Sequence, residues 1–430
     1  MNRLSIVLLF VCSLRFSSGR VGAFSAPEHQ FLSRRQSLEK AVDAATGGVA
    51  TVVVVAAPIV VYADDEETPA APAAVVPVGK NRGNKKLVVA VIGYTGGVGR
   101  CLLSAMKKIG LQPYALVRSS TMKLGCCVDN VVDGDDTEEI ISTDYDILSA
   151  YLLKQGGIPV IVDVTASSAV QENNYATFLT HGISIVAANK GIFAGREDNY
   201  QAILTAAKEG KCRLLHETTV GAGLPILGTL QSLKASSHTI VTVAGILSGT
   251  LAFVLGQIAG GKKTFSQAVK EANELGYTEP DPRDDLNGMD VARKAVILAR
   301  VAGMKGVELT GMTIESLVPE TLRTCSVEEF MTRLCEYDKS MADRVAKVEA
   351  AQGRLHYAAN VDVTQNKVEV GMLSFEASHP FNNAGPDTIV AITTNFHTPR
   401  PLVIQGAGAG GDVTATGVLA DILQCANQPS

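Results

Sequence analysis

The feature that most constrains the fold is an apolar strand that leads directly into a glycine-rich turn. Residues 87–92 read Leu-Val-Val-Ala-Val-Ile, a continuous run of apolar and mostly β-branched side chains. Such a run is typical of a strand that is covered on both faces in a parallel sheet. Residues 93–99 contain four glycines, and apolar side chains then recur at helical spacing to residue 109. A strand, a glycine turn and a helix in this order predict an α/β fold with a doubly wound, Rossmann-like sheet.

The glycine turn is the candidate cofactor site. Glycine lets backbone N–H groups approach a pyrophosphate, and the following helix offers its N-terminus to the negative charge. The spacing is G-x-x-G-x-x-G, one residue longer than the usual G-x-G-x-x-G, so a plain glycine turn is the alternative. The residues expected to contact the dinucleotide are Gly93, Thr95, Gly96, Gly97, Val98 and Gly99.

The residue after the second predicted strand bears on the choice of dinucleotide. That strand covers residues 113–117 and is followed by Arg118, where an NAD site usually offers Asp or Glu to the ribose 2′-hydroxyl. An arginine suits a 2′-phosphate, which predicts NADP(H) in preference to NAD(H). The alternative is an exposed arginine with no cofactor role.

Strands and helices continue to alternate to residue 216. Strands are predicted over residues 159–164, 183–187 and 212–216, and helices over residues 169–180 and 197–209. In such sheets ligands bind beyond the carboxyl ends of the strands, which is where Thr165 and Lys190 stand. Lys190 either contacts an aldehyde or carboxylate there or is simply solvated.

A second candidate site is the carboxylate-rich stretch of residues 276–290. Its prolines and glycines predict an ordered polar loop in place of a helix. Its five carboxylates repel one another, so the loop either faces water or receives a cation such as a substrate ammonium group. A helix is predicted over residues 288–302, with Asp290 and Lys294 on one face. Lys294 is either a proton donor that Asp290 orients or one half of an exposed salt bridge.

The first 84 residues are interpreted as targeting sequence. Residues 1–23 combine arginines with an apolar run too short to span a bilayer, as a signal peptide does. Residues 24–84 are interpreted as a transit peptide and a Pro/Ala linker, and the whole resembles the bipartite presequences of complex plastids. This predicts the plastid stroma, without stable membrane association. Simple secretion, and export to the thylakoid lumen through the Arg34-Arg35 pair, are the alternatives.

Composition excludes several other functions. The 38 Lys+Arg and 43 Asp+Glu give a formal charge of −5, without any basic block of the kind that binds nucleic acid. The 8 cysteines include no C-x-x-C pair, which excludes a zinc framework and a disulfide scaffold. A small molecule is therefore the expected partner.

The carboxylate-rich stretch also carries a long family signature. Residues 276–294 read Gly-Tyr-Thr-Glu-Pro-Asp-Pro-Arg-Asp-Asp-Leu-Asn-Gly-Met-Asp-Val-Ala-Arg-Lys, which resembles the signature of the homoserine dehydrogenases. The other matching segments are residues 188–190, 217–225, 246–250 and 405–410. The resemblance extends from residue 87 to the C-terminus. It implies an enzyme that interconverts L-aspartate 4-semialdehyde and L-homoserine with NAD(P)H, toward threonine, methionine and isoleucine.

The resemblance also implies roles for individual residues. Glu279 and Asp285 would hold the ammonium end of the substrate, and Asp290 would lie beside the reacting carbon. Lys294 would protonate the carbonyl oxygen, and Lys190 would support it.

A monovalent cation such as Na⁺ is implied too. The residues implied for it are Glu217, through its side chain, and Val220, Ala222 and Leu224, through their carbonyls. Thr165, Lys190 and Gly410 would join the glycine turn at the cofactor. The glycine spacing departs from the family, as does Ala166, where a serine is usual. A short, monofunctional homodimer is expected.

The expected domains are a nucleotide-binding domain over residues 85–220, a substrate and dimerisation domain over residues 221–400, and a segment over residues 401–430 that returns to the first domain. Two rival functions stay open. One is an aldehyde dehydrogenase acting on aspartyl phosphate, which would need a nucleophilic cysteine such as Cys126 or Cys127. The other is a catalytically silent NADPH-binding sensor, which would not need Lys294.

Overall fold

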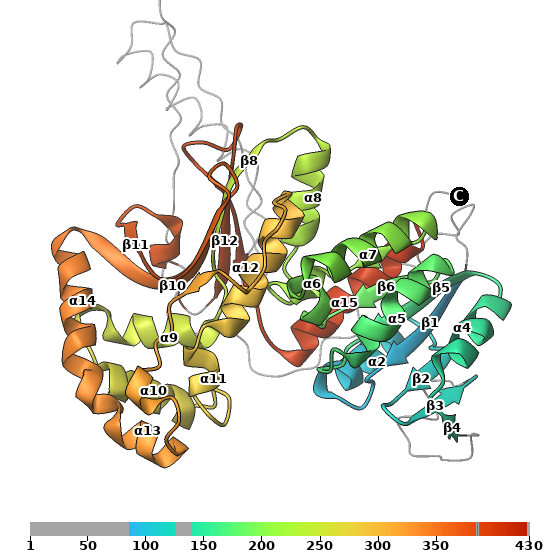
Figure 1. Ribbon diagram of the computed structural model, residues 1–430, viewed down its shortest axis with the longest axis horizontal. Helices are drawn as coiled ribbons and strands as arrows, with labels where there is room; N and C mark the ends of the chain where they lie inside the picture. Colours follow the sequence, from blue (N-terminus) through green and yellow to red (C-terminus); the bar gives the residue numbers. More distant parts are fainter. Residues whose placement is uncertain (1–85, 126–139, 384, 386, 428–430) are drawn as a thin grey trace, which may run out of the picture. The chain divides into compact units, whose positions relative to one another are not determined.

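Two β-sheets organise the part of the chain that the structure describes (Figure 1). The structure is a computed structural model and describes residues 86–125, 140–383, 385 and 387–427. The predicted presequence and the Cys126-Cys127 pair lie outside the described residues. The first sheet has the strand order β4-β3-β2-β1-β5-β6-β7, and the second has the order β13-β12-β8-β10-β11-β9.

The first sheet is the predicted doubly wound sheet with an antiparallel edge. Strands β2, β1, β5, β6 and β7 run parallel, whereas β3 and β4 pair antiparallel with their neighbours. The strands are β1 (Leu87–Ile92), β2 (Ala115–Val117), β3 (Thr121–Leu124), β4 (Ile140–Ser142), β5 (Ile158–Asp163), β6 (Ser184–Ala187) and β7 (Leu214–Leu215).

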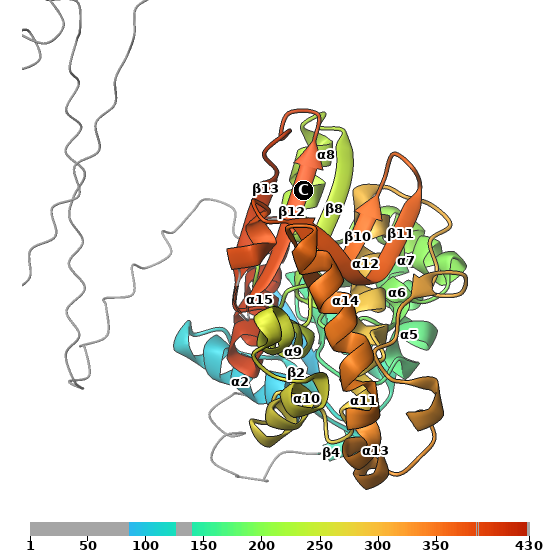
Figure 2. The ribbon, with the colours of Figure 1, turned by 90° about the vertical axis from the view of Figure 1, so that its left-hand side faces the viewer.

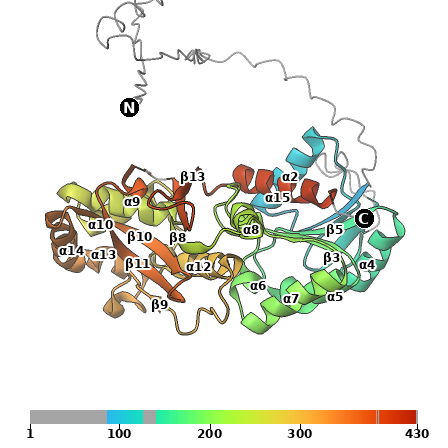
Figure 3. The same ribbon diagram turned by 90° about the horizontal axis from the view of Figure 1, so that it is seen from above.

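Helices cover both faces of this sheet, as the apolar run in β1 requires (Figure 3). On one face, Val89 and Val91 share a buried cluster with side chains of α2 (Gly97–Lys108) and α15 (Gly411–Cys425). On the other face, Val88 and Ala90 share a cluster with side chains of the remaining helices. Those helices are α4 (Tyr145–Lys154), α5 (Ala169–Thr180) and α7 (Glu197–Glu209).

The second sheet carries the helix of the signature on one face. Its strands are β8 (Ile240–Ile246), β9 (Thr313–Ile314), β10 (Gly353–Asp362), β11 (Lys367–Glu376), β12 (Thr388–Thr394) and β13 (Leu402–Gly406). Its helices are α8 (Leu227–Ala235), α9 (Gly249–Ile258), α10 (Phe265–Glu274), α11 (Arg283–Leu286), α12 (Met289–Ala302), α13 (Val327–Arg333) and α14 (Asp338–Ala350). Helix α12 contacts β8, β10 and β11, while α10 contacts both α9 and α14 (Figure 2).

The fold class is the predicted one, an α/β protein with a Rossmann-like domain and a second α/β domain. Two details differ from expectation. The carboxylate-rich stretch is not wholly a loop, because α11 forms one helical turn within it. Strand β13 extends the second sheet to Gly406, beyond the expected boundary at residue 400. Within the described residues, no helix is long and apolar enough to cross a membrane.

Candidate active site

Helix α12 presents Asp290 and Lys294 together at the carboxyl end of β8. The Nζ of Lys294 lies 2.7 Å from Oδ2 of Asp290 and donates a hydrogen bond of 2.7 Å to the carbonyl of Leu247. The side chain of Lys294 is only 14% exposed. An exposed salt bridge, one of the two readings that the sequence left open, does not describe this lysine. Its ammonium group is held inside the protein by a carboxylate and a carbonyl.

Lys190 reaches the same carboxylate from the first sheet. It follows β6 at the start of the one-turn helix α6 (Gly191–Ala194), and its Nζ lies 3.5 Å from Oδ1 of Asp290. Burial alone would raise the pKa of Asp290, but the charges of Lys294 and Lys190 outweigh it and lower this pKa. Two ammonium groups therefore flank one ionised carboxylate, and this cluster joins residues far apart in the sequence.

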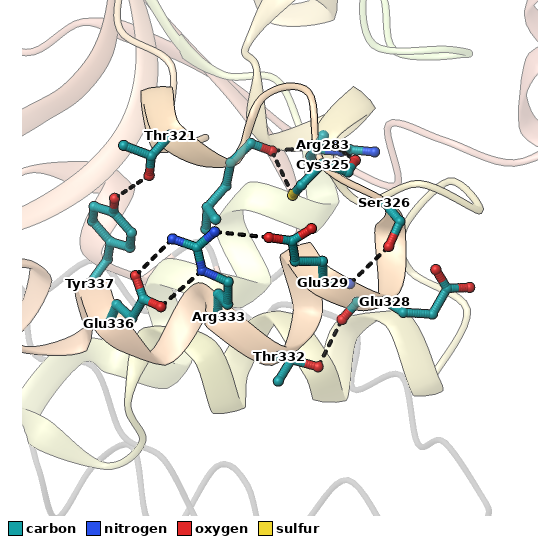
Figure 4. A network of polar contacts seen from close by, with 11 residues as sticks. Arg283, Thr321, Cys325, Ser326, Glu328, Glu329, Thr332, Arg333, Glu336 and Tyr337 are labelled. Carbon is teal, nitrogen blue, oxygen red and sulfur yellow. Dashed lines mark hydrogen bonds and ion pairs between the residues drawn. The ribbon is translucent and has the colours of Figure 1, made fainter.

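The signature loop holds fewer free carboxylates than its composition predicts. Asp281 pairs with Arg283, whose Nη2 lies 2.6 Å from Oδ2 of Asp281. Arg283 also donates from Nη1 to the carbonyl of Cys325 at 2.7 Å, at the side of the polar network of α13 (Figure 4). This arginine therefore fastens the loop to the segment that precedes α13.

Asp285 has a different environment from Asp290. Its Oδ2 accepts the backbone N–H of Glu279 at 2.8 Å, and its Oδ1 lies 3.2 Å from the hydroxyl of Thr250. Burial raises the pKa of Asp285, and the nearby Asp290 charge adds to the rise. The structure thus places Glu279, Asp285 and Asp290 along one edge of the site. A cationic ligand at this edge would meet Asp285, whose carboxylate accepts a backbone N–H and a hydroxyl among the described residues, whereas Asp290 is already paired with two lysines.

The glycine turn packs closely enough that glycine is required at two of its positions. Gly93 has φ +86°, and a Cβ there would lie 2.8 Å from Cγ2 of Thr165. A Cβ on Gly99 would lie 2.5 Å from the carbonyl oxygen of Gly93. By contrast, a Cβ on Gly97 would meet nothing within 4 Å. The turn therefore has one packed side and one open side.

The C-terminal segment reaches the open side of the turn. Gly410, with φ +112°, precedes α15, and a Cβ on Gly411 would lie 3.9 Å from the carbonyl oxygen of Gly97. Helices α2 and α15 therefore begin beside each other at the turn (Figure 3). Two helix N-termini and a glycine turn fit the pyrophosphate of a dinucleotide. The candidate cofactor residues of both chain ends are thus brought together.

Arg118 lies at the carboxyl end of β2, with its guanidinium carbon 5.3 Å from the ring centre of Tyr94. This cation–π contact holds the guanidinium beside the glycine turn, while the side chain stays exposed. Lys123, in the neighbouring strand β3, is only 8% exposed.

Sequence reasoning missed a buried residue that holds Thr165. Asp163, fully buried at the end of β5, accepts the backbone N–H of Thr165 at 2.8 Å and its hydroxyl at 2.7 Å. Its other oxygen accepts the hydroxyl of Tyr175 at 2.8 Å. Burial raises the pKa of Asp163. An aspartate in an otherwise apolar strand was the signal that could have found it.

The residues expected to bind a cation surround a turn with a strained backbone. Gly221 and Ala222 both have positive φ, +78° and +51°. The carboxylate of Glu217 accepts the backbone N–H groups of Leu227 and Gly228 at 2.6 and 2.7 Å, so it caps α8. Burial raises the pKa of Glu217. Val220 and Ala222 are buried, whereas Leu224 is partly buried.

A glycine turn beside two helix N-termini, a carboxylate edge and a largely enclosed ammonium donor are together typical of an NAD(P)-dependent oxidoreductase. Comparison with protein families identifies which one. Residues 95–217 match the NAD-binding domain model of homoserine dehydrogenase, and residues 225–423 match the homoserine dehydrogenase model. The chain belongs to the homoserine dehydrogenase family.

Curated relatives agree with this family. The homoserine dehydrogenase of Emericella nidulans is 42% identical over 289 residues, which cover 65% of this chain and 78% of that protein. The bifunctional aspartokinase/homoserine dehydrogenase 1 of Zea mays, described as chloroplastic, is 38% identical over 357 residues. That match covers 79% of this chain but only 38% of the maize protein.

Solved structures share the fold. A Candida auris protein of unknown function is 35% identical, with a TM-score of 0.75, over 80% of this chain and 99% of that chain. A hyperthermophilic archaeal homoserine dehydrogenase mutant in complex with NADPH has a TM-score of 0.60 at 24% identity, over 80% of this chain and 99% of that chain.

Proposed function

We propose that this protein reduces L-aspartate 4-semialdehyde to L-homoserine with NADPH, in a reversible reaction. The observation that carries the proposal is the buried ammonium group of Lys294, held at 2.7 Å by both Asp290 and the carbonyl of Leu247. A charged donor in a fixed orientation is what a carbonyl oxygen requires when negative charge develops on it.

The protein's own residues supply the proton and the electrostatic field. When bound, the nicotinamide supplies a hydride to the carbonyl carbon. Lys294 gives the proton on Nζ to the carbonyl oxygen and regains one from solvent. Asp290 orients Lys294, and Lys190 stabilises the same developing charge from the other side of that carboxylate.

The carboxylate edge recognises the other end of the substrate. Among the described residues, the Asp285 carboxylate accepts hydrogen bonds from the backbone N–H of Glu279 and the hydroxyl of Thr250, and Glu279 stands on the same loop. The ammonium group of the substrate would form ion pairs with the carboxylates of both Asp285 and Glu279. Since the reacting carbon must lie near Lys294, the edge also fixes the direction in which the substrate enters.

The first test is turnover. NADPH oxidation with L-aspartate 4-semialdehyde should be measured for protein that begins near Lys80, for its Lys294→Ala variant and for Lys270→Ala as the matched control. Lys270 forms only an exposed ion pair with Glu274. We expect kcat to fall by a factor of about 10²–10⁴ in Lys294→Ala, the usual contribution of a positioned proton donor. Lys270→Ala should retain full activity.

Other outcomes separate the rival functions. No turnover with NADPH or NADH, in protein that still binds the cofactor, would overturn the enzyme and support the NADPH-binding sensor. Turnover that survives in Lys294→Ala would keep the reaction but remove Lys294 as the donor.

We propose NADPH over NADH because Arg118 stands exposed beside the glycine turn, held against Tyr94. A guanidinium complements the extra phosphate of NADPH, and no carboxylate follows β2 to bind a ribose hydroxyl instead.

We also propose a structural Na⁺ held by carbonyls of Val220, Ala222 and Leu224 beside Glu217. The buried hydroxyl of Thr218, in the same turn, has no hydrogen-bond partner among the described residues. An oxygen atom without a partner is what a cation at this turn would require as a further ligand. Because the carboxylate of Glu217 already caps α8, its contribution would be the negative charge. Carbonyl oxygens are suitable ligands for a hard cation.

Assembly and location complete the proposal. We propose a homodimer in the plastid stroma, reached through the bipartite presequence. The chloroplastic description of the maize relatives supports a plastid. The stroma also supplies the NADPH that the reaction consumes.

A further inference from the structure

A buried arginine links the catalytic helix to the loop of Lys190. Arg300 lies in α12, toward the opposite end from Asp290 and Lys294, and its side chain is 1% exposed. Its guanidinium donates to the carbonyls of Phe193 at 2.8 Å and Gly195 at 2.7 Å. The two carbonyls belong to the first half of the described chain, so the contact joins the two sheets.

Both carbonyls lie at the end of the helical turn that Lys190 begins. Helix α6 starts after Lys190, and the N–H of Ala194 donates to the carbonyl of Lys190 at 2.9 Å. The last carbonyls of a helix have no partner within the helix. Arg300 supplies these partners, so the position of α12 fixes the end of the turn. Figure 1 shows α12 beside α6.

The start of the same turn is held from the opposite side. Gln171, on α5 and 1% exposed, accepts the N–H of Ile192 at 2.9 Å and donates to the carbonyl of Asn189 at 3.1 Å. Gln171 therefore holds the residues on either side of Lys190, and Arg300 holds the end of the turn that follows it.

Arginine is the side chain that this site requires. The guanidinium donates to three carbonyls, those of Phe193, Gly195 and Val307, and its Nε lies 3.0 Å from Oε2 of Glu197. The planar guanidinium directs two separate nitrogens at the three carbonyls while its charge pairs with Glu197, whereas a lysine carries its charge and its donors on one nitrogen. Glu197 balances the buried charge, which makes the contact tolerable in the interior.

We infer that Arg300 is a positioning residue that sets the place of Lys190 against Asp290 and Lys294. The inference rests on the proposed function for its kinetic consequence. Arg300 does not touch the substrate edge itself. It acts by tying the helix that carries Asp290 and Lys294 to the turn that carries Lys190, so that the ion pair of 3.5 Å forms across the two sheets.

The test is a double-mutant cycle. Arg300→Lys should lower kcat about tenfold to a hundredfold, because a small misplacement at an active site has an effect of that size. In a Lys190→Ala background the same substitution should cost little more, since the group that it positions is gone. Arg293→Lys, an exposed change in the same helix, is the matched control and should leave kcat unchanged.

A measurement without turnover separates this inference from the proposed function. Acylation of Lys190 by acetic anhydride, followed by mass spectrometry, should be faster in Arg300→Lys, because the ammonium loses its carboxylate partner. Acylation of Lys270 should not change. If the wild-type protein shows no turnover but Lys190 responds in this way, the proposed function fails and the positioning role stands.

Two results would overturn the inference. One is an equal loss of kcat from Arg300→Lys with and without Lys190, which would indicate a general effect on the fold. The other is unchanged acylation of Lys190. If Arg300→Lys does not fold, Gln171→Leu takes its place in both measurements, since it frees the other side of the same turn.

Discussion

At the scale of single residues, the site sets two carboxylates of one loop and helix in opposite electrostatic states. Asp290 lies between two ammonium groups, which lower its pKa despite burial. Asp285 accepts hydrogen bonds from a backbone N–H and a hydroxyl, and burial raises its pKa. The charge of Asp290 is neutralised by lysines of the protein, whereas the described partners of Asp285 are neutral groups. This division agrees with the proposed roles, in which Asp290 belongs to the lysine cluster and Asp285 recognises the substrate.

We therefore expect Asp285→Asn to weaken substrate binding while leaving the protein at least as stable at neutral pH. A raised folded-state pKa favours the protonated form, so its stabilising effect is complete below the unfolded-state pKa and is lost as pH rises through the folded-state pKa. At neutral pH the ionised Asp285 therefore weakens the fold. Asparagine removes the charge, can accept from Glu279 N–H and can donate to the hydroxyl of Thr250.

Urea unfolding should show Asp285→Asn as stable as the wild type or more so at pH 7, with the difference shrinking toward pH 4. The KM for L-aspartate 4-semialdehyde should rise about tenfold to a hundredfold, the value of a lost charge-assisted hydrogen bond. A variant that unfolds more easily at pH 7 while retaining its KM would contradict both assignments.

At the scale of elements, the glycine turn has a packed side and an open side, and each makes a separate demand. On the packed side, Gly99 brings α2 against the backbone of Gly93 and Tyr94. On the open side, Gly97 leaves room for a ligand at the N-terminus of α2. The unusual spacing of the glycines is therefore compatible with both requirements of a dinucleotide turn.

Gly99→Ala and Gly97→Ala should separate these two demands. A Cβ on Gly99 would lie 2.5 Å from a carbonyl oxygen and 2.6 Å from Cα of Tyr94, and backbone cannot yield easily. We expect a loss of about 1–3 kcal/mol in the free energy of unfolding. Gly97→Ala meets nothing, so it should not destabilise the protein but should weaken NADPH binding. Denaturation and fluorescence titration measure the two effects, and equal stability losses would refute the distinction.

At the scale of the described chain, the last helix belongs with the first strand. Helix α15 packs beside α2 on the sheet that β1 begins, and its buried side chains join the cluster of Val89 and Val91. The C-terminal segment thus closes one face of the nucleotide sheet and also begins beside the glycine turn. Folding of the nucleotide half depends on residues at the opposite end of the sequence.

Ile422→Ala tests this dependence. Ile422 is fully buried in α15, whereas its neighbour Leu423 is 45% exposed. Removing the buried side chain should lower the free energy of unfolding by about 2–5 kcal/mol and should weaken NADPH binding with it. Leu423→Ala should change stability by less than about 0.5 kcal/mol. Equal effects from the two variants, measured by urea unfolding, would show that α15 does not seal this face.

The sequence determined the elements and much of the chemistry, because both depend on local order. The apolar period placed β1, α5 and α7 within a few residues of their observed bounds, and the helical spacing placed Asp290 and Lys294 on one face. Four residues between two side chains on a helix define their proximity without any tertiary contact. The long signature defined the family in the same way.

Only the tertiary structure decided which charges meet. Lys190 reaches Asp290, Arg283 removes Asp281 from the set of free carboxylates, and Arg300 joins the two sheets. Contacts between distant segments depend on how strands are ordered in a sheet and where helices cross it. Periodicity along the chain carries no information on that order. The packing of the two domains therefore decided which charged side chains are buried and which of them form pairs.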